Sequence, residues 1–147
     1  MPTISSRGTP RTGVRVYFYR GIAADVRKEV RRVVAGYQAL HPADHFVSIR
    51  VVPAVCITTP DDGGTGFGVF FRPPWRPDRH RSPVLIGVAG KPLHEAGPRS
   101  QAVARIGVTV LHELTHYDQW RAGRRMTERG VEVRAKNLRR RIVGRKH

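Results

Sequence analysis

Residues 112–116 read HELTH, an instance of the HExxH pattern in which two histidines four residues apart enclose a glutamate. On a helix, side chains at i and i+4 project from the same face, so both imidazoles can bind one tetrahedral zinc ion. A catalytic zinc site has a third protein ligand and keeps its fourth position for water, whose pKa the metal lowers to about 7. Glu113 directly follows the first histidine, which suits it to take a proton from that water rather than to bind the ion. The pattern therefore predicts a zinc centre with its own general base.

The segment around the motif, residues 108–117, is apolar on nearly every side and predicts a buried helix. Two histidines and a glutamate left unpaired in such a helix would cost on the order of several kcal/mol, which a bound metal would offset. The alternative is a pair of core histidines and a glutamate that are satisfied by hydrogen bonds alone. Ser100 as N-cap and Gly123 as C-terminal stop predict a helix from about 101 to 122.

A second helix is expected after the basic turn at Arg124 and Arg125, with Thr127 as its N-cap. Apolar residues recur at helical spacing along it and should pack on the core. They are Val131, Ala135, Leu138 and Ile142.

Two glutamates, Glu128 and Glu132, lie four residues apart on the flank of this apolar stripe, and they are the last acidic residues of the chain. One of them is the expected third zinc ligand. Glu132 is preferred because it comes further into the expected helix and lies beside the buried stripe, whereas Glu128 falls on the exposed first turn. Glu128 is the alternative ligand, and a solvated pair that offsets nearby arginines is the alternative for both.

The motif followed by a short connection and by Glu132 and Ala135 in an E-x-x-A context resembles the zincin metallopeptidases of the gluzincin type. In that group a glutamate from a following helix completes the two-histidine site. The resemblance implies zinc-dependent hydrolysis of peptide bonds, with one zinc ion per chain held by His112, His116 and Glu132, and with Glu113 as the base. It covers residues 100 to about 140, and more loosely the whole chain as a minimal zincin domain.

The position two after the second histidine is usually apolar in these enzymes and is Asp118 here. Asp118 either orients an imidazole of the site or faces solvent. No motif marks the group that would stabilise the oxyanion, and the candidates for it are Tyr117, His80 and His94.

The rest of the chain is expected to form the scaffold that positions this site. Alternating or β-branched runs predict strands, and apolar residues at helical spacing predict a helix that ends at His41 and Pro42. The expected strands are 14–19, 46–52, 67–71 and 82–88, and the expected helix is 24–40.

This order predicts an α+β fold, a small zincin-like domain in which a twisted, mostly four-stranded sheet packs on the active-site helix, with one N-terminal and one C-terminal helix. The glycine in strand 67–71 suggests an edge strand or a bulge. An edge strand in this position either pairs with an extended peptide substrate or only supports the sheet.

We expect residues 1–12 to form a flexible N-terminal segment and residues 13–147 to form one zincin-like metallopeptidase domain. No apolar run approaches the ~20 residues of a membrane span, and no hydrophobic signal segment opens the chain. The lone Cys56 excludes an intrachain disulfide and fits a reducing compartment. These features predict a cytoplasmic protein with no membrane partner.

The formal net charge is +16, and basic residues are concentrated in the C-terminal quarter. Such a surface attracts polyanions, so DNA or RNA is a candidate partner. The alternative is an arginine-rich composition with a solvated helix face, since no nucleic-acid-binding motif accompanies the charge. The candidate nucleic-acid contacts are Arg124, Arg125, Arg139, Arg140 and Arg141.

Three functions from different classes follow. The first is a zinc metallopeptidase that acts on a protein or peptide substrate. The second is a basic nucleic-acid-binding module with a structural zinc site, against which the intact Glu113 argues because a structural site has no use for a general base. The third is a toxin-like or regulatory effector protease on the same fold.

Overall fold

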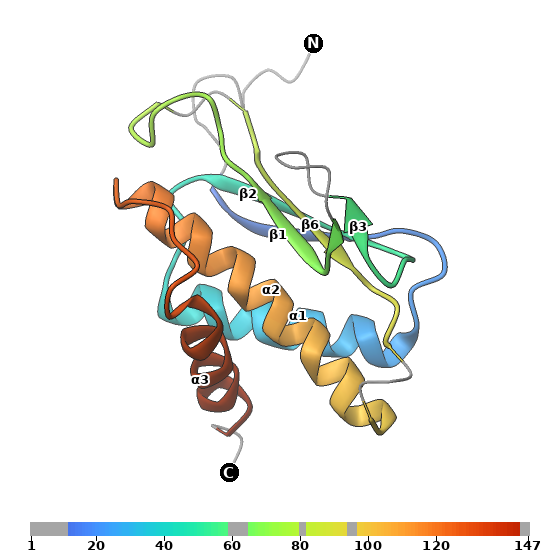
Figure 1. Ribbon diagram of the computed structural model, residues 1–147. Helices are drawn as coiled ribbons and strands as arrows, with labels where there is room; N and C mark the ends of the chain where they lie inside the picture. The colour runs from blue at the N-terminus through green and yellow to red at the C-terminus, as the bar shows by residue number, and fades with distance from the viewer. Residues whose placement is uncertain (1–11, 59–64, 80–81, 94–96, 145–147) are drawn as a thin grey trace.

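The computed structural model describes residues 12–58, 65–79, 82–93 and 97–144 (Figure 1). Within these ranges the chain forms three helices, a four-stranded sheet and a separate two-stranded ladder. The elements are β1 (Gly13–Phe18), α1 (Ala24–Leu40), β2 (Phe46–Val52), β3 (Ile57–Thr58), β4 (Thr65–Gly66), β5 (Gly68–Phe71), β6 (Val84–Ala89), α2 (Arg99–Arg121) and α3 (Val131–Gly144).

The main sheet has the strand order β1-β2-β6-β5. β1, β2 and β6 run parallel, and β5 pairs antiparallel with β6. Parallel neighbours require long connections, and α1 provides the one between β1 and β2. β5 is an edge strand of this sheet. It lies over α2, next to the predicted zinc motif.

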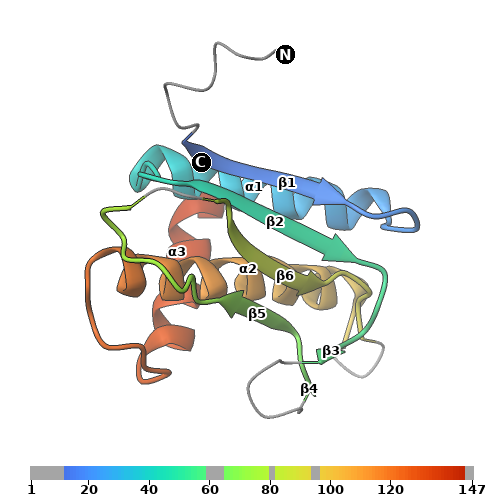
Figure 2. The same ribbon diagram turned by 90° about the horizontal axis from the view of Figure 1, so that it is seen from above.

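All helices lie on one side of the sheet, as Figures 1 and 2 show. α1 packs there through a stripe of buried residues at helical spacing that includes Val26, Val30, Val33 and Tyr37. β2 and β6 meet this layer with alternating buried aliphatic residues, which are Val47, Ile49, Val51, Val84, Ile86 and Val88. The sheet and the two long helices therefore enclose one hydrophobic core.

α2 is buried on most sides, as the apolar sequence around the motif predicts. It begins at Arg99 and ends at Arg121, within two residues of the expected limits. Ser100 is not its N-cap, because Pro98 occupies that position. Gly123 has a φ of 72°, and its N–H donates to the carbonyl of Trp120, which confirms it as the C-terminal stop.

α3 begins later than predicted, at Val131 rather than near Thr127. Gly130 has a φ of 75°, a left-handed conformation that cannot continue a right-handed helix. Glu128 therefore lies in a loop before α3, and Glu132 lies in the first turn of the helix. The two glutamates do not share a helix face.

A buried ion pair fixes α3 against the rest of the molecule. Glu29 of α1 is only 3% exposed, and its carboxylate accepts hydrogen bonds from Arg139 of α3 at 2.7 and 3.1 Å and from Arg32 at 2.8 Å. Ile142 packs directly on Gly36 of α1, and a side chain at position 36 would occupy the space that Ile142 fills. α3 is thus held by both a charge pair and apolar contact.

The α+β class, the four-stranded sheet and the N- and C-terminal helices are confirmed. The helix 24–40 and the strand 46–52 have the predicted limits. The short ladder of β3 and β4 was not predicted, because each strand has only two residues. The predicted flexible segment falls almost entirely on residues outside those described. In the described part of the chain, no helix combines the length and apolar character needed to cross a membrane.

Candidate metal centre

The imidazoles of His112 and His116 lie one turn apart on α2, with ring centroids separated by 5.1 Å. His116 is buried, and the side chain of His112 is 20% exposed. The helical spacing predicted from the sequence thus places the two imidazoles side by side, and solvent reaches the ring of His112.

The Nδ1 atom of each histidine is held by an oxygen acceptor. His112 Nδ1 lies 2.9 Å from Oε1 of Glu132, and His116 Nδ1 lies 2.9 Å from Oε1 of Gln119. With Nδ1–H as donor in both contacts, each neutral ring presents the lone pair of its Nε2 atom on the other side. This is the tautomer in which histidine binds a metal through Nε2.

Glu128 lies opposite these two Nε2 atoms. Its Oε1 is 3.0 Å from Nε2 of His112, and its Oε2 is 2.9 Å from Nε2 of His116. One ligand atom from each of the three residues falls within 4.8 Å of the other two. His112, His116 and Glu128 therefore form a group that could hold a metal ion.

The polar atoms of this group fit a bound cation. Among the described residues, the buried Nε2 of His116 has no partner in hydrogen-bond geometry, although Glu128 is within ion-pair distance. Two imidazole lone pairs facing a carboxylate are compatible only when a proton or a cation lies between them. Two imidazoles and one carboxylate suit zinc in both ligand type and number.

Glu132 was the expected third ligand, but it is the alternative, Glu128, that lies with the two Nε2 atoms in the structure. Glu132 contacts the opposite nitrogen of His112, where a carboxylate orients the ring and raises its basicity. The turn at Gly130 is the physical reason, since it frees Glu128 from the helix and lets the loop approach the histidines.

Glu113 lies beside this group and is only 6% exposed. Burial raises the pKa of Glu113 to about 7, because desolvation outweighs the favourable charge of His112, and the charges of Glu128 and Glu132 add to the rise. This pKa is that of the metal-free protein, and a cation bound beside Glu113 would lower it again. A buried carboxyl group next to a metal can accept a proton from water and later release it, which is the requirement for a general base that then acts as an acid.

The pKa of His112 is raised in the metal-free protein. Burial lowers it, but the hydrogen bond to Glu132 and the negative charges of Glu113 and Glu128 outweigh burial. Protons therefore compete with a metal for this histidine as the pH falls.

Gln119 is a site residue that the sequence analysis missed. Its Oε1 accepts from His116, and its Nε2 donates to the carbonyl of Thr127 at 3.1 Å. One side chain thus fixes an imidazole and also anchors the loop that carries Glu128. The available signal was its position three residues after His116, on the same helix face.

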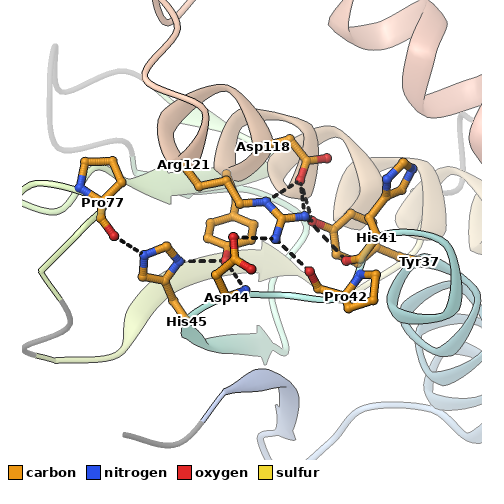
Figure 3. Close-up of polar contacts among 9 residues, drawn as sticks. Tyr37, His41, Pro42, Asp44, His45, Pro77, Asp118 and Arg121 are labelled. Atoms are coloured by element: carbon orange, nitrogen blue, oxygen red, sulfur yellow. Dashed lines mark hydrogen bonds and ion pairs between the residues drawn. The ribbon is translucent and has the colours of Figure 1, made fainter.

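Asp118 neither orients an imidazole of the motif nor simply faces solvent. Its Oδ1 accepts from the hydroxyl of Tyr37 at 2.7 Å and from Nη2 of Arg121 at 2.9 Å (Figure 3). Two residues along a helix correspond to about 200° of rotation, so Asp118 points away from His116 toward α1.

Tyr117 is not available to stabilise an oxyanion at the metal group. Its hydroxyl lies 2.8 Å from Nδ1 of His45 and accepts the N–H of Asp44. His45 Nε2 lies 2.7 Å from the carbonyl of Pro77, which can only accept, so Nδ1 of His45 accepts from Tyr117 (Figure 3). The other two candidates, His80 and His94, lie outside the described residues.

A pocket of about 290 Å³ opens beside His112 and Glu113. Its walls come from the start of β5, the end of β6, the first half of α2 and the first turns of α3. This volume lies at the small end of the range of ligand pockets, which begins at about 300 Å³.

Of the predicted nucleic-acid contacts, Arg139 has a structural role, because its guanidinium is bound by the buried Glu29. The other four, Arg124, Arg125, Arg140 and Arg141, are exposed. When the chain is compared with protein-family models, curated proteins and solved structures, none of them matches it.

Proposed function

We propose that this protein is a zinc-dependent metallopeptidase with a small zincin-like domain, in which His112, His116 and Glu128 bind the metal. The convergence of two imidazole Nε2 atoms on one carboxylate at 2.9 and 3.0 Å carries the proposal, since an oxygen acceptor lies 2.9 Å from Nδ1 of each ring and orients its Nε2 toward that carboxylate. The buried Glu113 beside them supplies the second requirement, a carboxyl group that can act as the base.

Zinc, when bound, would polarise the scissile carbonyl and make the attacking water more acidic. Glu113 accepts a proton from this water as its oxygen attacks the carbonyl carbon. The same carboxyl then delivers the proton to the leaving nitrogen as the C–N bond breaks. Glu132 and Gln119 keep the two imidazoles oriented throughout.

The edge strand β5 is the proposed docking site for an extended substrate. Within the described residues, β5 pairs only with β6, and its first residue packs directly against Glu113. A peptide added along the free side of β5 would bring its backbone carbonyls to the catalytic group.

A buried general base distinguishes this proposal from a nucleic-acid-binding module with a structural zinc site. Placing a carboxyl where burial raises its pKa in the metal-free protein destabilises its charged form there, and a purely structural site gains nothing from that. An effector protease would use the same chemistry and would differ only in its substrate.

The test combines zinc content with cleavage of a mixed peptide pool, read by mass spectrometry. Glu113→Gln should keep zinc and lose cleavage by about a thousandfold or more, as expected for removal of a general base. His112→Ala and His116→Ala should lose both zinc and cleavage. Asp78 is exposed and belongs neither to the metal group nor to the pocket beside it. Asp78→Asn is therefore the matched control, which should change neither the zinc content nor the cleavage. Undiminished cleavage by Glu113→Gln would contradict the mechanism.

A further inference from the structure

The pocket beside His112 and Glu113 combines an apolar lining with positive charge. Apolar contact comes from Val55, Phe67, Leu93, Ala102, Ile106 and Val108. Three cationic side chains also line it, one from each of three separate parts of the chain: Lys91 after β6, Arg105 of α2 and Lys136 of α3.

These cations are incompletely neutralised. Lys136 lies 3.9 Å from Glu132, a carboxylate that is already bound to His112. For Lys91 and Arg105, no carboxylate of the described residues lies within ion-pair distance, and both are exposed. Glu113 also lines the pocket, so the three cations face two carboxylates, and one positive charge is in excess when both carboxylates are ionised. An apolar pocket in which Lys91 and Arg105 keep no carboxylate partner among the described residues favours a ligand group that pairs a short carbon chain with a carboxylate.

The distance from the metal group to Arg105 can be compared with the length of an extended substrate. Arg105 precedes His112 by seven residues on the same helix face, with Thr109 between them in the pocket wall. Seven helical residues span about 10 Å, and an extended peptide covers that distance in about three residues. The charged part of the pocket is therefore within three substrate residues of the scissile bond.

The direction of β5 identifies which side of the scissile bond enters the pocket. The pocket adjoins Phe67 and Gly68, at the beginning of β5. A peptide paired antiparallel to β5, the more stable arrangement, runs from the Phe71 end toward the Gly68 end. Its residues after the scissile bond therefore reach the pocket.

We propose that this pocket selects a carboxylate on the C-terminal side of the scissile bond, within three residues of it, with Arg105 and Lys91 as the specificity-determining residues. The carboxylate is either an Asp or Glu side chain or the free C-terminus of a short leaving segment. This inference rests on the proposed peptidase function and adds its substrate class.

The test is a digest of a diverse peptide pool by the zinc-loaded protein, with cleavage sites identified by mass spectrometry. Acidic residues or free C-termini should be enriched about tenfold within three positions after the cleaved bond, as expected for charge-assisted recognition at a partly exposed site. Arg105→Gln and Lys91→Gln should each reduce the enrichment, and Arg105→Glu should shift it toward Lys and Arg. Arg15→Gln, on the far edge strand β1, is the matched control and should keep the wild-type preference.

Synthetic peptides separate the two sources of the carboxylate. Glu→Gln exchange after the cleaved bond removes the side-chain carboxylate, and C-terminal amidation removes the terminal one. Binding of the same fluorescent peptides to zinc-loaded Glu113→Gln, measured by anisotropy, gives a readout independent of turnover. Loss of affinity on one exchange and not on the other identifies the source.

The outcomes for the two proposals differ. Cleavage without enrichment of carboxylates, or enrichment that persists in both Arg105→Glu and Lys91→Gln, would overturn the specificity inference and leave the peptidase function intact. A wild-type protein that takes up no zinc and cleaves no peptide would overturn the proposed function, and this inference with it.

Discussion

Gly68 of β5 lies directly against the carboxylate of Glu113. A Cβ at position 68 would stand 2.9 Å from Oε2 of Glu113 and 2.7 Å from Cγ2 of Thr109, closer than such atoms approach. Only glycine lets the edge strand pass this near to the proposed base, so the strand itself fixes where the carboxylate lies.

Gly68→Ala should therefore displace Glu113 without removing the metal ligands. We expect kcat to fall by about tenfold to a hundredfold, the effect of a displacement near 1 Å at a catalytic group, with zinc content unchanged. The double variant Gly68→Ala with Thr109→Ser relieves the contact with Cγ2 but not the one with Glu113, so it should stay impaired. Full recovery in the double variant would assign the defect to Thr109 instead.

The raised pKa of Glu113 has a consequence for stability in the metal-free protein. Its pKa rises from 4.5 to about 7 on folding, so the native state keeps a proton that the unfolded chain has lost between these values. Stability from this group is fully present below pH 4.5 and declines as the pH rises to 7. At about 1.4 kcal/mol per pKa unit, the decline is at most about 3 kcal/mol.

Glu113→Gln mimics the protonated form and should remove this decline. With EDTA present, urea unfolding of wild type and variant should give similar free energies at pH 4.5, and the variant should be the more stable at pH 8. Equal free energies at both pH values would show that burial does not perturb Glu113 as described.

Gln119 links His116 to the loop that carries Glu128, so its loss should loosen two ligands together. We expect Gln119→Leu to weaken zinc binding by about 10- to 100-fold, the usual effect of removing a group that orients a metal ligand. Competition with a chromophoric chelator measures this affinity. Gln101→Leu, an exposed glutamine near the start of the same helix, should bind zinc like wild type.

The parts of the fold and of the metal group that the sequence predicted correctly are those that depend on local spacing along the chain. The helix 24–40 and the strand 46–52 have uninterrupted periodicity and abrupt ends, and both were predicted to the residue. The two histidines were found because helical spacing alone brings them together. The position of Glu128 was not predicted. It depends on Gly130, whose left-handed backbone conformation places Glu128 in a loop before α3.

Contacts between distant segments account for the remaining differences. The glycine of the edge strand could be noticed in the sequence, but its contact with Glu113 depends on how β5 lies over α2. Asp118 was considered near the site because it is close in sequence, whereas its partner Tyr37 comes from α1, 81 residues earlier.

The ion pair between Glu29 and Arg139 should contribute to the stability of the α3 contact. Arg139→Gln leaves the buried carboxylate with Arg32 as its remaining guanidinium partner. We expect a loss of about 2 kcal/mol in the free energy of unfolding, less than for a fully orphaned charge. Arg140→Gln, its exposed neighbour on the same helix, should change stability by less than about 0.5 kcal/mol. Similar losses for the two variants in urea unfolding would contradict a structural role for Arg139.

In the proposed zinc site, Glu128 is the third ligand beside His112 and His116, and Glu132 orients His112 from outside. The most direct measurement is the zinc content of wild type, Glu128→Ala and Glu132→Ala by elemental mass spectrometry after dialysis against a series of free zinc concentrations. We predict one zinc ion per wild-type chain, none retained by Glu128→Ala, and full occupancy of Glu132→Ala only at about 10- to 100-fold higher free zinc. Zinc lost from Glu132→Ala but retained by Glu128→Ala, or no zinc in the wild type, would contradict this site.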